Sequence, residues 1–118
     1  MRREDLVRLQ HMRDSAREAL GFVGGRGREE FARDRMLALA VLKSVEIIGE
    51  AASKVSEESR KELPGLAWKE MVGIRNRLIH GYFDIDFDRV WNTVRDDLPE
   101  LAQRLEAFLT RQTGGAGK

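Results

Sequence analysis

Apolar residues recur every three or four positions along most of the chain, which is the spacing of helices with one buried face. The first such stretch covers residues 4–23 and ends at the glycine-rich segment 24–27. The second covers residues 28–56, and its middle part, ALAVLKSVEIIGEAA, is apolar on nearly every side. We therefore predict that the second helix is central in the fold. Gly49 in its middle predicts the close approach of a neighbouring segment.

The second half of the chain contains two more helical stretches. A polar linker at residues 57–66 precedes a third stretch at residues 67–80. A fourth follows the segment DIDFD, where Asp86 or Asp88 is the expected N-cap. Pro99 lies inside this fourth stretch and predicts a kink or a helix restart. With no strand-like alternation of useful length, the pattern predicts an all-α, up-and-down bundle of four to five helices.

Length and charge narrow the class of protein. The chain has 118 residues, which suits one helical domain at residues 1–112 followed by a disordered glycine-rich tail at residues 113–118. The formal net charge is only +1, so any site for an anion must be built locally. The chain lacks cysteine, a signal-peptide core and an apolar run of about 18 residues. We therefore expect a cytoplasmic protein that does not associate with a membrane.

The segment RNRLIHGY, residues 75–82, holds one of the two histidines and the only tyrosine. On an ideal helix through this segment, Asn76, Arg77 and His80 share one side. Arg75 then lies about 140° from His80 around the helix axis. Within one copy of the chain, the two side chains are therefore badly oriented to contact the same phosphate. Two copies that face each other across an interface would supply a composite site.

These residue types suit the cleavage of RNA by transesterification. Histidine titrates nearest neutrality and can act as a base or an acid. Arginine stays protonated and offers a planar fork that matches phosphate oxygens. However, a histidine near the C-terminal end of a helix is often only a capping residue, and Arg-Asn-Arg is often a solvated surface. The residues by themselves leave the function open.

RNRLIHGY resembles the R-x-x-x-x-H-x-Y signature of the HEPN superfamily, and specifically of its HepT-like branch. Asn76 matches the polar residue that typically follows the arginine. Residues 71–101 resemble the branch around the motif, and residues 45–58 resemble its central helix. The resemblance extends over most of residues 4–110.

This resemblance implies a homodimeric bundle whose motif helices face each other, and a metal-independent endoribonuclease that uses no cofactor. Arg75 and His80 would be the catalytic pair, Asn76 would orient them, and Arg77 would bind a neighbouring phosphate. Members often act as the toxin of a type VII toxin–antitoxin system. The antitoxin is an MntA-type nucleotidyltransferase that transfers AMP to the motif tyrosine, here Tyr82. The alternatives are a non-catalytic subunit that docks a nucleotidyltransferase or binds a nucleotide, and a purely structural bundle.

Two other patterns resemble parts of metal sites but lack the required ligands. The aspartates of DIDFD alternate, but a calcium loop that starts at Asp84 would have Arg89 and Arg95 where it needs glycine and glutamate. These aspartates are better explained as helix caps. His11 has no second ligand at a metal-binding spacing, so we expect it on the surface.

Overall fold

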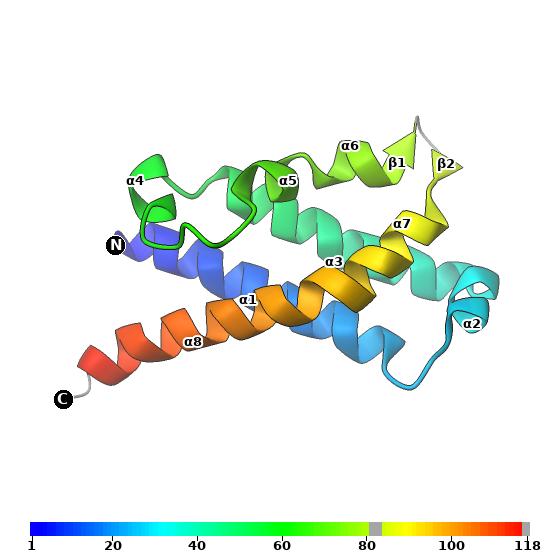
Figure 1. Ribbon diagram of the computed structural model, residues 1–118, viewed down its shortest axis with the longest axis horizontal. Coiled ribbons are helices and arrows are strands. Elements are labelled where there is room, and N and C mark those ends of the chain that lie inside the picture. Colours follow the sequence, from blue (N-terminus) through cyan, green and yellow to red (C-terminus); the bar gives the residue numbers. More distant parts are fainter. Residues whose placement is uncertain (81–83, 117–118) are drawn as a thin grey trace.

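The computed structural model describes the backbone of residues 1–80 and 84–116, with side chains up to Ile79 and from Asp84 to Gln112 (Figure 1). Its main bodies are α1 (Arg3–Val23), α3 (Arg35–Ser53) and a long C-terminal helical run. That run consists of α7 (Phe87–Asn92), the π-helical segment η1 (Thr93–Asp97) and α8 (Leu98–Ala116). The predicted all-α helical bundle is confirmed.

The core lies where α1, α3 and the C-terminal run pack together. Each of them contributes apolar side chains at helical spacing that are fully buried: Leu9, Met12, Val41, Val45, Val94 and Leu105. The central position predicted for α3 is confirmed, because α1, α5 and α6 all contact it. None of the helices in the described part of the chain is long and apolar enough to cross a membrane.

The second predicted helix is divided in two. α2 (Arg28–Arg33) ends at Asp34, whose backbone is extended, and α3 begins directly afterwards. The Asp34 side chain accepts a hydrogen bond from the backbone N–H of Leu37 at 3.0 Å, which caps α3. Phe31 of α2 is buried and packs its ring against Trp91. The prediction of one continuous helix over residues 28–56 was therefore wrong at Asp34.

The predicted polar linker contains a short helix, α4 (Glu57–Arg60), which is fastened to the start of α1 by a buried carboxylate. The Asp5 side chain accepts hydrogen bonds from the Ser56 backbone N–H at 3.2 Å and hydroxyl at 2.7 Å, and from the Ser59 hydroxyl at 2.6 Å. We call these three residues the Asp5 cluster. Burial raises the pKa of Asp5, but the hydrogen bonds from Ser59 and Ser56 outweigh burial and leave this pKa below its ordinary value.

The third predicted helix is also divided. α5 (Trp68–Val72) and α6 (Ile74–Leu78) are separated at Gly73, and the chain then turns into a small hairpin. β1 (Ile79–His80) pairs antiparallel with β2 (Asp84–Ile85), with Ile79 opposite Ile85. The backbone N–H of Asp86 donates to the Leu78 carbonyl at 2.8 Å, which ties the hairpin to the end of α6. The helix predicted through residue 80 therefore stops two residues early.

Gly49 of α3 allows α5 and α6 to lie directly on the central helix. A Cβ atom at this position would be 2.9 Å from the Met71 carbonyl oxygen and 3.0 Å from Cγ2 of Ile74. Real Cβ atoms scarcely reach such distances, and the nearer obstacle is backbone. The predicted close approach at Gly49 is confirmed, and it fixes the position of α6, which carries the motif.

The C-terminal run begins at Asp86, whose carboxylate accepts a hydrogen bond from the backbone N–H of Arg89 at 3.1 Å. Asp86 is thus the cap, one of the two predicted. η1 comes immediately before the turn that contains Pro99. Proline lacks an N–H group and crowds the preceding turn, and the π-helical hydrogen bonding accommodates this. α8 continues to Ala116.

Candidate functional site

Two buried side chains hold α6 in place and leave its polar residues on the outside. Ile74 and Leu78 lie one helical turn apart and are buried against the core. The three residues between them, Arg75, Asn76 and Arg77, are all exposed. The short helix therefore presents two guanidinium groups and one amide at the surface, on a backbone fixed by the packing at Gly49.

Arg75 faces the side of the molecule formed by α1 and α3. Its side chain is 67% exposed, and its Nε lies 4.0 Å from a carboxylate oxygen of Glu46, at the outer limit of an ion pair. It borders a cavity of about 460 Å³, which we call the α1–α3 groove. The residues that line this groove are Arg8, His11, Lys43, Glu46, Ile47, Glu50, Ala51, Lys54 and Arg75. The Arg75 guanidinium is thus loosely held and can take an anion.

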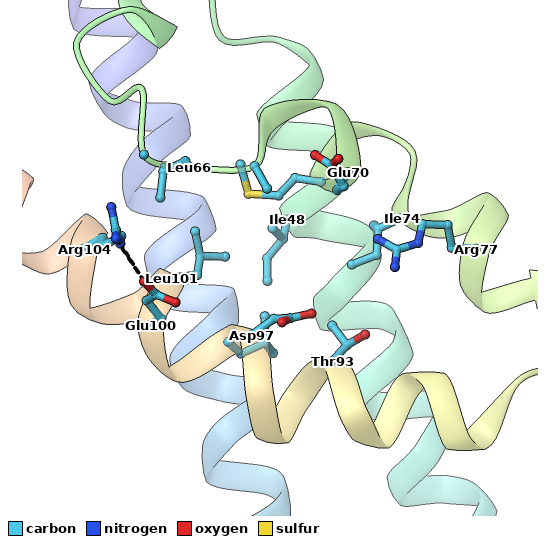
Figure 2. Close-up of a pocket in the computed structure, with 14 residues that line it drawn as sticks. Ile48, Leu66, Glu70, Ile74, Arg77, Thr93, Asp97, Glu100, Leu101 and Arg104 are labelled. Carbon is cyan, nitrogen blue, oxygen red and sulfur yellow. Dashed lines mark hydrogen bonds and ion pairs between the residues drawn. The ribbon is translucent and has the colours of Figure 1, made fainter.

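Arg77 lines a different cavity, of about 350 Å³, on the side toward the C-terminal run (Figure 2). We call it the Arg77 cavity. Ile48, Ile74 and Leu101 provide apolar lining, and polar side chains that include Glu70, Thr93 and Asp97 also border it. Arg75 and Arg77 are two residues apart on a helix, so their side chains diverge by about 200°. They border separate cavities of the chain.

The predicted grouping of Asn76, Arg77 and His80 on one helical side was wrong in its geometry. Ile79 has an extended backbone, with φ −124° and ψ 123°, so His80 follows α6 in a strand and not at a helical position. Asn76 is exposed and makes no hydrogen bond within the part of the chain that is described. The side chain of His80 and the whole of Tyr82 lie outside the described residues, so their proposed roles stay predictions.

The α1–α3 groove brings in residues that the sequence patterns did not connect with the motif. His11 is exposed, as expected, but it shares this groove with Arg75. On α3 the lining residues Lys43, Ile47 and Lys54 fall on one stripe at helical spacing. That stripe is readable from the sequence, whereas its position beside Arg75 is not. Across the described residues, no group of three potential metal ligands is found.

Comparison with known proteins shows to which family this chain is similar. The family described as "Ribonuclease HepT-like" matches residues 12–108. The protein named "Putative RNase MJ1380" from Methanocaldococcus jannaschii is 38% identical over 98 residues, which cover 83% of this chain and 90% of that protein. "Putative RNase TTE0752" from Caldanaerobacter subterraneus subsp. tengcongensis is 33% identical over 88% of this chain and 93% of its own length.

A third relative is named "Probable ribonuclease HepT" and comes from Thermococcus cleftensis. It is 37% identical over 78 residues, which cover 66% of this chain and 71% of that protein. No solved structure matches this chain significantly. The matched residues 12–108 include α6, the hairpin and the complete RNRLIHGY segment.

Proposed function

The chain belongs to the HepT-like ribonuclease family. From this premise we propose that it is a metal-independent endoribonuclease in which Arg75 and His80 are the catalytic pair. The observation that carries the proposal is the position of Arg75 within the matched region. Its side chain is 67% exposed on a helix that packs against Gly49, and among the described residues its only ion-pair partner is Glu46 at 4.0 Å. Such a cation is free to bind a phosphate.

The proposed reaction is a transesterification within the RNA strand. A base removes the proton of a ribose 2′-hydroxyl, and that oxygen attacks the neighbouring phosphorus. The bond from phosphorus to the 5′-oxygen breaks, and an acid returns a proton to the leaving oxygen. His80 handles protons in this scheme, and Arg75 stabilises the negative charge that builds on the phosphate oxygens. The products are a 2′,3′-cyclic phosphate and a 5′-hydroxyl end.

We further propose that the working site is composite and forms between two copies of the chain. Arg75 and Arg77 of one protomer serve separate surfaces. A second motif facing the first would bring additional cations to the same strand. In this arrangement Asn76 orients the reacting groups and Arg77 binds a neighbouring phosphate.

The regulatory part of the proposal concerns Tyr82 and an antitoxin. The protein acts as the toxin of a HepT/MntA-type, type VII system in the cytoplasm, and a nucleotidyltransferase neutralises it by transferring AMP to Tyr82. The added phosphate charge and bulk would repel and obstruct an RNA backbone beside the motif. Incubation with an MntA-type nucleotidyltransferase and ATP should add the mass of AMP groups to wild type, and none to Tyr82→Phe.

Cleavage itself is tested with purified wild-type and His80→Ala protein on an end-labelled RNA in EDTA. We expect wild type to produce 2′,3′-cyclic phosphate ends. His80→Ala should be slower by about 10²- to 10⁴-fold, the usual contribution of a positioned acid–base group. Equal behaviour of the two proteins would remove the catalytic assignment of His80. An inert wild type would remove the nuclease proposal.

The second candidate function is a non-catalytic subunit that docks a nucleotidyltransferase or holds a nucleotide. The Arg77 cavity favours it, because apolar lining with a few charged groups is typical of binding pockets. A docking subunit would bind the nucleotidyltransferase but leave RNA intact in EDTA. The cleavage experiment therefore separates the two candidates.

A further inference from the structure

The α1–α3 groove has an excess of positive charge in one small area. Four cationic side chains line it, Arg8, Lys43, Lys54 and Arg75, against two glutamates, so its formal net charge of +2 exceeds the +1 of the entire chain. They come from three helices that are distant in sequence and adjacent in the fold. The concentration of charge is a product of the fold.

Two of these cations are not neutralised within the described part of the protein. Lys54 pairs with Glu50 at 3.2 Å, and Arg75 lies near Glu46. These two glutamates are the only acidic residues among those that line the groove. Arg8 and Lys43 have no carboxylate within ion-pair distance in the described part of the chain. The groove therefore carries an excess of positive charge.

Arg8 adds a second observation. Its side chain is partly buried, and its Nε is buried without a hydrogen-bond partner among the described residues. A buried donor without an acceptor is unfavourable. Among the described residues Arg8 therefore keeps an unsatisfied donor, on a side chain that lines the same groove as Arg75.

The shape of the groove indicates the class of ligand. Its lining on α3 runs from Lys43 to Lys54, a distance of about 16 Å along the helix axis. This length suits an extended chain of repeated charges better than a single small anion. No Phe, Trp or Tyr is present among the described lining residues, so the groove offers no stacking surface for bases. It suits a phosphate backbone.

We propose that the α1–α3 groove binds the phosphate backbone of the RNA strand next to the bond that is cut, with Arg8 and Lys43 as contacts to flanking phosphates. This inference rests on the proposed function, because Arg75 of the motif forms part of the same groove. Binding through the backbone alone contributes affinity and register but no base selection.

The test measures binding of a labelled single-stranded RNA by the full chain at several salt concentrations. All proteins carry His80→Ala, so that the RNA is not consumed. Lys43→Ala is compared with Lys69→Ala, which removes the same charge from an exposed position on α5 that lines neither cavity. Arg8→Gln provides a second variant in the groove.

We expect Lys43→Ala to weaken binding by about fivefold on all RNA sequences, and Lys69→Ala to leave it unchanged. The slope of log K against log salt should fall in magnitude by about 0.7 for the lost phosphate contact. Arg8→Gln should change affinity and slope in the same direction. Lysine 43 is exposed, so its replacement should not impair folding.

The outcomes separate this inference from the nuclease proposal. If wild type cuts RNA while Lys43→Ala and Lys69→Ala bind alike with unchanged slopes, the groove assignment is overturned and the nuclease remains. If Lys43→Ala weakens binding but wild type does not cut, the groove is supported and the nuclease proposal fails. Absence of RNA binding by every protein would overturn the groove assignment, while cleavage by wild type would still decide the nuclease proposal.

Discussion

Polar side chains gather in two regions of this molecule, the Asp5 cluster at the start of α1 and the exposed side of α6. In the Asp5 cluster, a buried carboxylate accepts three hydrogen bonds and the polar groups satisfy one another. On α6, Arg75 has only a carboxylate 4.0 Å away, and Asn76 makes no hydrogen bond within the described residues. One region is closed on itself and the other is left open to a ligand.

The difference teaches how stability and function are divided in a small helical domain. A buried polar network stabilises the fold only when its groups are satisfied, which the Asp5 cluster achieves. A binding surface must keep hydrogen-bonding capacity unused until a ligand arrives. Substitutions in the first region should therefore change stability, and substitutions in the second should change activity.

Within this comparison of the two regions, the largest effect is expected from Arg75→Ala. Cleavage of RNA should fall by about 10²- to 10³-fold, as when one group that stabilises transition-state charge is removed. The free energy of unfolding should change by less than about 0.5 kcal/mol, because the side chain is mostly exposed. Initial rates of cleavage and urea titrations measure the two quantities. Arg75→Lys should also be impaired, since lysine lacks the planar fork.

A marked loss of stability in Arg75→Ala would contradict the assignment of this region to function. It would show that the approach to Glu46 supports the fold. Retention of full cleavage would instead remove Arg75 from the catalytic pair.

The converse substitution is Asp5→Ala. It removes the acceptor of three hydrogen bonds and leaves the buried Ser59 hydroxyl and the partly buried Ser56 hydroxyl without their partner, so we expect a loss of roughly 2–4 kcal/mol in unfolding free energy. Asp14→Ala is the matched control on the same helix, because Asp14 is exposed and its ion pair with Arg13 lies at the surface. Urea titrations of both variants measure the difference.

Cleavage by Asp5→Ala, measured well below its melting temperature, should equal that of wild type. A large fall in its catalytic rate under those conditions would mean that the Asp5 cluster is coupled to the site. Equal stabilities of Asp5→Ala and Asp14→Ala would show that the buried network contributes little.

The smallest effect is the pH dependence of the Asp5 cluster. Hydrogen bonds hold the pKa of Asp5 below its ordinary value of 3.8, so the ionised carboxylate favours the folded state. This stabilisation is fully present above the unfolded-state pKa and is lost as the pH falls through the folded-state pKa. The stability difference between wild type and Asp5→Asn should therefore shrink below about pH 4.

Urea titrations at pH 7, 4 and 3 follow that difference. A difference that stays constant over this range would mean that Asp5 has the same pKa in the folded and unfolded states.

Much of this architecture was predictable from local signals in the sequence. The spacing of Leu9, Met12, Val41 and Val45 predicted the two long helices that form the core. Gly49 predicted a close contact, and Asp86 was one of two expected caps. The RNRLIHGY segment located the candidate site before its surroundings were known. Each of these signals depends on residues within a few positions of one another.

Other features became visible only in the tertiary structure. Asp34 interrupts a stretch whose apolar pattern continues without a break, because its side chain caps α3 while Phe31 packs against Trp91. α6 ends at Leu78 because Ile79 pairs with a strand that follows it in the chain. The apolar spacing that predicted a helix through residue 80 carries no information about this strand pairing, which replaces the last helical turn.

The sequence by itself determined the main helical segments and the short motif that is the candidate site, since periodicity and residue type are local properties of the chain. Only the tertiary structure decided that Arg75 joins Arg8 and Lys43 in one groove while Arg77 borders another cavity. It also decided that Asp5 meets two serines more than fifty residues away. Such groupings depend on how helices pack, because packing brings side chains together regardless of their separation in sequence.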